Sequence, residues 1–219
     1  MVFYKKFLIM GIGAQLNKYE RDALEYFGMK YDGLVWCELG SQLNRTQHRS
    51  AKSVYIKRGV DHTSIDLDGK WGSLKLDLDE AVPDELLNKF DVVTNYGTIE
   101  HVNNQYSAFK NMHDMCKVDG IIIHGFPKKE TFLGHCRYYY DEEFVDKIAR
   151  KCSYDIHRLK IIDLGRSGKD KTNHLLTVVF VKTKMEFISE GDFTKLPIFD
   201  SGDLHRTGNY TKGRKRKPK

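Results

Sequence analysis

Apolar runs alternate with amphipathic or turn-like stretches along most of the chain. Seven runs have the length and composition of buried strands, at residues 33–39, 62–67, 73–78, 90–96, 120–126, 154–164 and 174–184. Helical spacing of apolar positions occurs at residues 17–30, and helical patterns follow at about 44–57, 80–88, 101–117 and 140–151. Strands that alternate with helices predict an α/β fold with a mostly parallel sheet covered on both faces. Because only a polar stretch separates the last two runs, they predict a hairpin and one antiparallel strand.

The length and composition predict one main domain, since 219 residues with 40% hydrophobic content suffice for one α/β core. We expect a helical cap over residues 1–32, the main domain over 33–185, and an extension over 186–219 that ends in a disordered basic tail. The "GIG" at residues 11–13 lacks the third glycine of a dinucleotide motif and is interpreted as a flexible turn. No apolar run reaches 18 residues and no signal-peptide cleavage pattern follows the start, which predicts a cytoplasmic protein without a membrane span. The oligomeric state is left open.

The positive charge is concentrated at the end of the chain. The formal net charge is +6, but seven Lys or Arg residues and no acid lie from Arg206 onward, so the first 205 residues carry a net charge of −1. The tail could contact a polyanion such as RNA, although a solvated end is the more common outcome for such runs. The body of the chain is therefore not basic.

The four cysteines are far apart in the sequence and form no C-x-x-C pair: Cys37, Cys116, Cys136 and Cys152. Zinc knuckles and redox motifs need close cysteine pairs. We therefore expect reduced thiols, several of them buried, because free cysteine behaves as a small hydrophobic residue.

Polar side chains recur at the carboxyl ends of successive predicted strands, at Glu38, Asp66, Asp77, Asn95 and His124. In open α/β sheets ligands bind at these ends, and an acid there typically accepts hydrogen bonds from ribose hydroxyls. Any single acid could instead cap a helix or lie in a solvated turn. The first strand leads into "VWCELGSQL", which has one glycine and an acid that would repel phosphate. A ligand with a ribose, a base and a cationic amino-acid part fits both facts.

Five stretches resemble the motifs of class I S-adenosylmethionine-dependent methyltransferases, in the family's order over residues 33–184: "VWCELGSQ", "SIDLDG", "LKLDLDE", "FDVVTNYGTIEHV" and "MCKVDGIIIHGFP". The fourth is the most specific match and is similar to the small-molecule branch of the family. The resemblance implies a Rossmann-like α/β fold with a seven-stranded sheet of order 3-2-1-4-5-7-6, strand 7 antiparallel, and S-adenosylmethionine as the cofactor. It departs from the family at Gln42, where a second glycine is usual, and at Val118 and Asp119, which replace Pro-Gly.

Carried over by position, the resemblance implies a cofactor site that follows the strand ends. Glu38 and Gly40 lie along the methionine part, Asp66 holds the ribose, and Asp77 faces the adenine. The complete set of implied cofactor residues is Glu38, Gly40, Ser41, Gln42, Asp66, Leu67, Asp77, Leu78, Asn95, Tyr96 and Gly97. The last three lie beside the transferable methyl group.

The acceptor side has three histidine candidates for a general base, His101, His124 and His135, because imidazole titrates near neutrality. The more common alternative for each is a hydrogen-bonded histidine without a catalytic role, and His101 is the weakest of the three because the pair in an E-H-V motif often braces the loop. Their spacing matches no zinc pattern, so we expect no metal. The segment "GHCRYYYDEEF" could form a lid that contacts the acceptor through Arg137, Tyr138 and Tyr139, or simply a helix start packed on the sheet. The helix at 17–30 could also cover the pocket.

The leading hypothesis is a methyltransferase that transfers a methyl group in line to the oxygen of a small-molecule or glycan-like acceptor. One alternative is a nucleic-acid methyltransferase that uses the basic tail, although the fourth strand ends in "TNYGT" rather than in an N-P-P-Y type signature. Another is a non-catalytic, nucleoside-binding member of the fold. This alternative is favoured by Gln42, which stands where a second glycine is usual. A nicotinamide dehydrogenase is disfavoured because the G-x-G-x-x-G turn is lacking.

Overall fold

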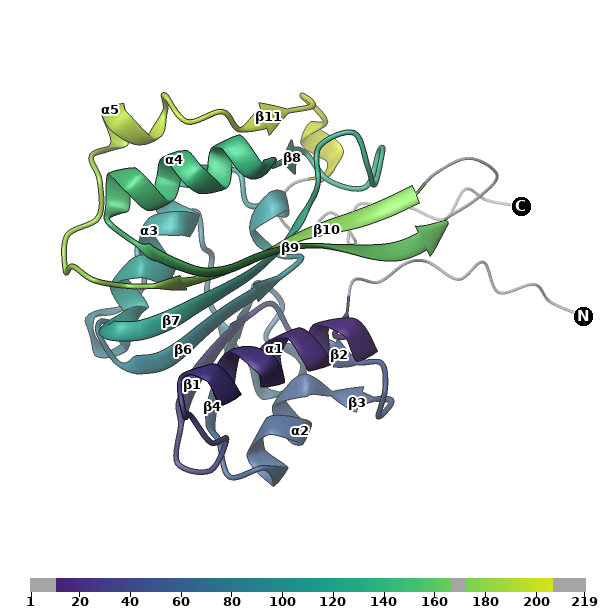
Figure 1. The fold of residues 1–219 in the computed structure, drawn as a ribbon, viewed down its shortest axis with the longest axis vertical. Coiled ribbons are helices and arrows are strands. Elements are labelled where there is room, and N and C mark those ends of the chain that lie inside the picture. The colour runs from purple at the N-terminus through teal and green to yellow at the C-terminus, as the bar shows by residue number, and fades with distance from the viewer. Residues whose placement is uncertain (1–10, 167–171, 207–219) are drawn as a thin grey trace, which may run out of the picture.

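A seven-stranded sheet forms the centre of the computed structural model, which describes residues 11–166 and 172–206 (Figure 1). In spatial order its strands are β5 (Leu74–Lys75), β4 (Asp61–Asp66), β1 (Val35–Leu39), β6 (Phe90–Tyr96), β7 (Cys116–Pro127), β10 (Thr172–Val181) and β9 (Asp155–Arg166). The first five are parallel, and β10 pairs antiparallel with both β7 and β9. Numbered along the chain, this is the order 3-2-1-4-5-7-6, so the predicted fold class is confirmed.

Helices cover both faces of the sheet (Figure 1). On one face lie α1 (Ala14–Tyr26) and α2 (Ala51–Lys57), and on the other lie α3 (Gln105–Met115) and α4 (Glu142–Cys152). α4 illustrates the local logic, because its buried positions Phe144, Ile148 and Cys152 recur at helical spacing. Asp141 accepts a hydrogen bond from the Phe144 N–H at its start. The helix ends at Ser153, which has a left-handed φ of 55°.

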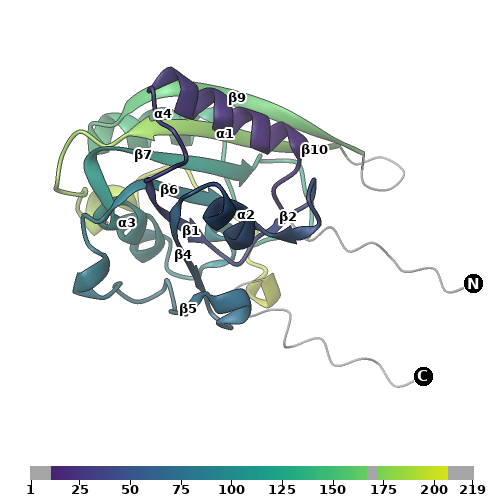
Figure 2. The ribbon, with the colours of Figure 1, turned by 90° about the horizontal axis from the view of Figure 1, so that it is seen from below.

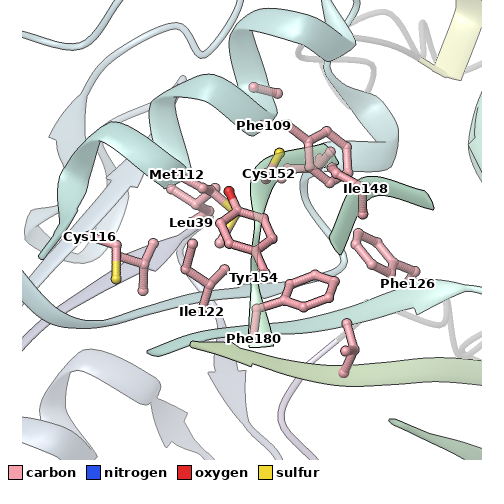
Figure 3. Close-up of a cluster of buried hydrophobic side chains, with 14 of the residues drawn as sticks. Leu39, Phe109, Met112, Cys116, Ile122, Phe126, Ile148, Cys152, Tyr154 and Phe180 are labelled. Carbon is pink, nitrogen blue, oxygen red and sulfur yellow. The ribbon is translucent and has the colours of Figure 1, made fainter. Parts of the chain in front are cut away.

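The apolar core that separates the sheet from helices α3 and α4 contains aromatic and sulfur-containing side chains, as Figure 3 shows. Phe109 and Met112 of α3, Ile148 of α4 and Phe180 of β10 meet there. All four cysteines are free and buried, as expected. A short helix, α5 (Glu190–Phe193), follows the sheet and adds its last residue to the same core.

Shorter elements lie at the carboxyl edge of the sheet and in its connections. They are the hairpin of β2 (Leu43–Asn44) and β3 (Arg49–Ser50), the pair of β8 (Tyr138–Tyr139) with β11 (Phe199–Asp200), and four 3-10 turns, η1 (Lys70–Gly72), η2 (Asp84–Leu86), η3 (Ile99–His101) and η4 (Leu204–Arg206). The expected basic tail falls largely on residues 207–219, outside the described part of the chain. No helix in residues 11–166 or 172–206 is long and apolar enough to cross a membrane.

The flexible turn expected at residues 11–13 is wrong. Ile12 is fully buried and pairs with Asn44, through hydrogen bonds of 2.9 Å to the Leu43 carbonyl and 3.0 Å from the Arg45 N–H. A Cβ at Gly11 would lie 2.6 Å from the same carbonyl, so the glycine permits the close backbone approach. The chain therefore enters the core before α1 begins.

Three expected helices are shorter than the pattern indicated. The stretch at 44–57 begins with the β2–β3 hairpin and becomes helical only after Ser50, whose hydroxyl caps α2. The stretch at 80–88 contains only η2, which starts after Pro83. The stretch at 101–117 is divided by Asn104, which caps α3 through the Ser107 N–H. Side-chain caps thus mark the starts of α2 and α3, whereas η2 follows Pro83 without one.

α1 packs directly on the sheet and on the β9–β10 pair (Figure 2). Leu16, Tyr19, Ala23 and Leu24 of α1 are buried in one apolar cluster with Trp36 of β1. The Tyr19 hydroxyl donates a hydrogen bond to the carbonyl of Arg158 on β9. This helix is therefore part of the main core, and it holds the first described residues beside the carboxyl edge of the sheet.

Candidate active site

The candidate site lies at the carboxyl ends of the parallel strands, around the position where the strand order reverses. β1 is paired with β4 on one side and with β6 on the other, and the loops that follow these three strands meet above them. Such a switch point leaves a crevice between loops that run in opposite directions. The predicted cofactor residues of β1, β4 and β6 are thus brought to one edge of the sheet.

The turn after β1 is held by Gly40, Gln42 and Thr98. Gly40 has a φ of +78°, and its N–H donates to the Ile65 carbonyl at 2.7 Å. A Cβ on Gly40 would lie 2.3 Å from the Thr98 hydroxyl oxygen and 2.8 Å from the Gln42 amide nitrogen. That hydroxyl donates to the Leu39 carbonyl at 2.8 Å and accepts from Gln42 at 3.3 Å. Gln42 therefore links the β1 turn to the β6 loop, which sequence reasoning did not foresee.

Asp66, the last residue of β4, connects two loops through its carboxylate. It accepts hydrogen bonds from the Ser41 N–H at 2.7 Å and from the Asp68 N–H at 3.2 Å. A carboxylate has about four lone-pair sites, so acceptor capacity remains for a diol at the strand end. Leu67 follows, half-buried, and Trp71 lies in η1 with about half of its surface exposed.

Glu38 lies one residue from the end of β1 and is buried, with 1% of its surface exposed. Neither of its carboxyl oxygens has a hydrogen-bond partner among the residues that the structure describes. Burial, together with the nearby Glu20, raises its pKa well above the ordinary value. His62 Nε2 lies 3.9 Å from the Glu38 carboxyl, and burial lowers the pKa of His62 to about 3. Burial thus favours the neutral form of both the carboxyl and the imidazole.

Glu20 of α1 is a buried site residue that the sequence analysis missed. Three tyrosine hydroxyls donate to its carboxylate, from Tyr31 at 2.8 Å, Tyr55 at 2.6 Å and Tyr96 at 3.1 Å. Desolvation raises the pKa of Glu20, and the three hydrogen bonds oppose that shift. The available signal was a charged residue on the apolar stripe of the predicted helix, between Leu16 and Ala23.

The predicted adenine side follows β5. Asp77 is exposed and its carboxylate accepts from the Asp79 N–H at 3.0 Å, which forms a tight turn. Leu78 is 5% exposed, and its carbonyl accepts from the Asn111 amide at 3.2 Å. The side-chain oxygen of Asn111 also accepts a hydrogen bond from the Val82 N–H, so this residue of α3 holds the turn in place.

The loop after β6 is shaped by Asn95, a residue predicted to lie beside the transferable methyl group. Asn95 is fully buried, and its side-chain oxygen accepts from the N–H groups of Thr98 and Ile99, each at 3.0 Å. Gly97 has a φ of +90°, which glycine adopts without strain. Asn95 is thus a positioning residue for this loop, whereas Tyr96 lines a cavity.

The cavity beside Tyr96 has a volume of about 260 Å³ and opens between the start of α1 and the β9–β10 pair. Leu16 of α1, Leu164 of β9 and Leu175 of β10 form apolar walls, and Arg45 is the one cationic side chain among the described residues that line it. No candidate histidine lines it. The first turn of α1 therefore borders this cavity, whereas no residue of the predicted helix at 17–30 is among its lining residues within the described chain.

The three candidate histidines separate into two groups. His124 is buried in an aromatic layer, with its ring 4.4 Å from the ring of Phe126, and burial lowers its pKa to about 3. Its environment is that of a neutral, structural side chain. His101 and His135 lie together in loops at the carboxyl edge, with ring centroids 5.3 Å apart.

Glu100 completes a cluster with these two histidines and was also missed as a site residue. It is fully buried, and neither carboxyl oxygen has a hydrogen-bond partner within the described chain. Burial raises its pKa to about 8. One ligand-type atom from each of Glu100, His101 and His135 lies within 4.8 Å of the others. The available signal was the acid that directly precedes His101 in the "IEHV" stretch.

The predicted acceptor lid is tied to the rest of the chain. The Arg137 guanidinium donates to both carboxylate oxygens of Asp200, at 2.8 and 2.7 Å, and to the Asn103 side chain at 2.6 Å. The Tyr138 hydroxyl donates to the Asn103 carbonyl, and the Tyr139 hydroxyl to the Phe132 carbonyl. These three side chains therefore brace the segment that carries His135.

Comparison with known proteins supports the family assignment. A family model described as "Methyltransferase domain" matches residues 47–124. No curated protein sequence matches the chain. A solved 1,6-didemethyltoxoflavin-N1-methyltransferase of Burkholderia thailandensis, with 1,6-didemethyltoxoflavin and S-adenosylhomocysteine bound, is similar with a TM-score of 0.57 and 14% identity, over 78% of this chain and 79% of that one.

Two further structures have similar folds. The N-methyltransferase NodS of Bradyrhizobium japonicum, in complex with S-adenosylhomocysteine, has a TM-score of 0.56 and 13% identity, over 78% of this chain and 89% of that one. The [4+2]-cyclase SpnF has a TM-score of 0.56 and 11% identity, over 77% and 82%. At such identities the likeness establishes the fold, and the family match covers its central part. Together with the strand order, these matches show that the chain has the fold of class I S-adenosylmethionine-dependent methyltransferases, with a methyltransferase-domain match over residues 47–124.

Proposed function

We propose that the protein binds S-adenosylmethionine at the carboxyl edge of β1, β4 and β6 and transfers its methyl group to a small-molecule acceptor, at oxygen. The observation that carries this proposal is the convergence of Gly40, Asp66 and the cavity at Tyr96 around the switch point. In this family fold, that is where a nucleoside with an amino-acid arm is expected.

The residues present fit the cofactor in their donor and acceptor chemistry. Asp66 has lone pairs left for the ribose hydroxyls, and Leu78 and Asp77 offer an apolar surface and an acceptor for the adenine. Glu38 is a buried acid without a hydrogen-bond partner in the described chain, which suits the cationic amino group of the methionine part. When bound, the cofactor supplies an activated methyl group on a sulfonium.

The acceptor is proposed to occupy the cavity beside Tyr96. Its volume of about 260 Å³ suits a small molecule or one sugar unit rather than a folded macromolecule. Leu16 and Leu175 would contact an apolar or planar part, and Arg45 would attract an anionic or polar group. The protein's part in the transfer is then mainly to hold the acceptor oxygen in line with the methyl group and to exclude water.

A proton must leave a hydroxyl acceptor during transfer. His101 and His135 are the candidates from the sequence that lie in loops at the carboxyl edge, whereas His124 is enclosed in the aromatic layer. Arg137, Tyr138 and Tyr139 are proposed to support the loop of His135 rather than to contact the acceptor, because their polar groups bond to other parts of the chain.

The cofactor half of the proposal is tested by titrating the full-length protein with S-adenosylhomocysteine in a calorimeter. Asp66→Asn should weaken binding by about 10–100-fold, because a hydrogen bond to a charged group contributes roughly 1.5–3 kcal/mol. Asp61→Asn is the matched control, since Asp61 is an exposed acid at the opposite end of the same strand. Equal affinities of the two variants would remove Asp66 from the site.

The acceptor half is tested with S-adenosylmethionine labelled on its methyl group, offered together with metabolite, glycan and RNA fractions. Label in the metabolite or glycan fraction supports the proposal. Label in RNA that is lost on deleting residues 207–219 would favour the nucleic-acid alternative instead. Tight cofactor binding without transfer to any fraction would favour a non-catalytic member of the fold. This outcome is tested because Gln42 stands where a second glycine is usual in the family, and its side chain lies close to Gly40.

A further inference from the structure

We propose that Glu100, His101 and His135 form a binding site for a divalent transition-metal ion in the loops that follow β6 and β7, at the carboxyl edge of the sheet. The three side chains come from two loops that are separate in the sequence, and one nitrogen or oxygen atom of each lies within 4.8 Å of the others. Metal binding by itself does not depend on the proposed methyl transfer.

Two loops are locked together at this position. η3 carries Glu100 and His101 and follows β6 directly, with its first N–H groups bonded to the side chain of Asn95. The segment after β7 carries His135, whose N–H donates to the Phe132 carbonyl at 2.9 Å. Arg137, two residues after His135, joins this segment to the η3 loop through Asn103 and to β11 through Asp200. The cluster is therefore held by a supporting shell, as a metal site requires.

The burial of Glu100 is the second, independent observation. A carboxyl group with 0% exposure normally has hydrogen-bond donors or a cation beside it, because burying it without a partner costs several kcal/mol. Within residues 11–166 and 172–206 no hydrogen bond reaches either oxygen. Tyr140, a buried hydroxyl near Glu100, donates instead to Gln105. A bound cation would supply the missing partner.

The donor set indicates the class of ion. Two imidazoles and one carboxylate suit Zn²⁺, Co²⁺, Mn²⁺ or Fe²⁺, whereas Mg²⁺ and Ca²⁺ prefer oxygen ligands throughout. At metal–ligand distances of about 2.0–2.2 Å, adjacent ligand atoms lie roughly 3 Å apart, so the three side chains would draw closer around the ion. Three protein ligands leave at least one position open, as in catalytic rather than structural metal sites.

The role of the open position rests on the proposed function. An oxygen of the acceptor could bind there, and the ion would lower the pKa of a hydroxyl and orient it. In that case His101 and His135 act through the ion rather than as general bases. A cluster that merely hydrogen-bonds internally would show none of this chemistry.

The test is a titration of metal-free, full-length protein with Co²⁺, followed by visible absorption, and then with Zn²⁺. We expect one equivalent of Co²⁺ to bind with ligand-field bands of a low-coordinate nitrogen and oxygen site, and Zn²⁺ to displace it, since Zn²⁺ binds such sites more tightly. Glu100→Gln and His135→Gln should each weaken Co²⁺ binding by more than the roughly 10–100-fold that losing an outer-shell partner costs. His48→Gln, at an exposed histidine of the β2–β3 hairpin, should bind Co²⁺ as the wild type does.

Folding of each variant is checked by its thermal unfolding and by its affinity for S-adenosylhomocysteine, both of which should stay close to wild type. Absence of Co²⁺ and Zn²⁺ binding to the wild type, or unchanged binding in Glu100→Gln and His135→Gln, would overturn the metal site. Failure of S-adenosylhomocysteine to bind while Co²⁺ binds would overturn the proposed function and leave the metal site standing. Loss of Co²⁺ binding in His48→Gln would show an adventitious surface site and overturn the inference.

Discussion

Burial makes the ionisation of Glu38 sensitive to any cation placed next to it. Desolvation and the neighbouring Glu20 raise its pKa well above the ordinary value, which favours the protonated carboxyl. An ammonium group nearby would favour the charged form and lower that pKa. Binding of a cationic amino-acid ligand is therefore coupled to loss of a proton.

We predict that S-adenosylhomocysteine binding at pH 7 releases protons, with Glu38 as their main source. The release is measured by calorimetry in buffers of different ionisation enthalpy. Adenosine, which lacks the amino-acid arm, should bind without it, and Glu38→Gln should abolish it. Buffer-independent binding enthalpy for wild-type protein would contradict this role of Glu38.

At the level of residues, the sequence identified those that lie at strand ends and left out those that approach from elsewhere. Asp66 and Gly40 were predictable because a strand, a turn and a family motif all point to them. Glu20 and Glu100 were not, because their importance comes from what surrounds them. Three tyrosines from three separate segments converge on Glu20, and no local pattern records that convergence.

Among the elements, the β8–β11 pair shows how one ion pair can hold a loop. Arg137 bonds both oxygens of Asp200, and only 18% of its side chain is exposed. Arg150 and Asp146 form a pair on the surface of α4 in which the arginine is 79% exposed. The Arg137–Asp200 pair is bidentate and partly shielded from solvent, whereas the Arg150–Asp146 pair is largely screened by water.

We predict that Arg137→Gln lowers the free energy of unfolding by about 1 kcal/mol, a modest value because Asp200 remains partly exposed to solvent screening. Arg150→Gln should change it by less than about 0.5 kcal/mol. Urea unfolding at neutral pH compares the two variants. Equal losses would mean that the bonds of Arg137 do not stabilise the lid segment more than an exposed helix pair does.

The sequence predicted the number and order of strands better than the ends of helices. Hydrophobic runs locate buried strands, and β6 lies at the residues where its run predicted it, Phe90–Tyr96. The third strand comprises only Leu74–Lys75, shorter than the predicted 73–78, because it lies at an edge of the sheet and both of its residues are exposed. Helix starts depended on single capping side chains such as Ser50 and Asn104, which periodicity does not detect.

For the whole molecule, the pH dependence of stability reflects buried groups far from the site. His113 of α3 donates from Nε2 to the Met185 carbonyl at 2.9 Å, so its Nδ1 accepts from the Tyr154 hydroxyl at 2.8 Å. Burial lowers its pKa from 6.5 to about 4. A neutral His113 therefore contributes fully above pH 6.5, and this contribution is lost as pH falls from 6.5 through about 4.

We predict that the stability difference between wild type and His113→Gln shrinks by about 2 kcal/mol between pH 7 and pH 5, since one pKa unit corresponds to about 1.36 kcal/mol. The free energies come from urea unfolding at each pH. His48→Gln, at an exposed position, should keep a constant difference from wild type. Parallel curves for wild type and His113→Gln would show that His113 does not titrate differently in the folded and unfolded states.

The contact of α1 with β9 has a consequence for how the molecule is made. Tyr19 bonds the carbonyl of Arg158, and Arg158 in turn pairs with Asp22. At about 5–20 residues per second, a ribosome needs roughly 7 to 26 seconds after making α1 to reach Arg158 of that strand. A helix of 13 residues is only marginally stable on its own, and part of the apolar face of α1 stays exposed to solvent until β9 has been made. α1 is synthesised well before β9 and therefore completes its packing only after β9 has been made, and this interval is when a chaperone would have most to protect.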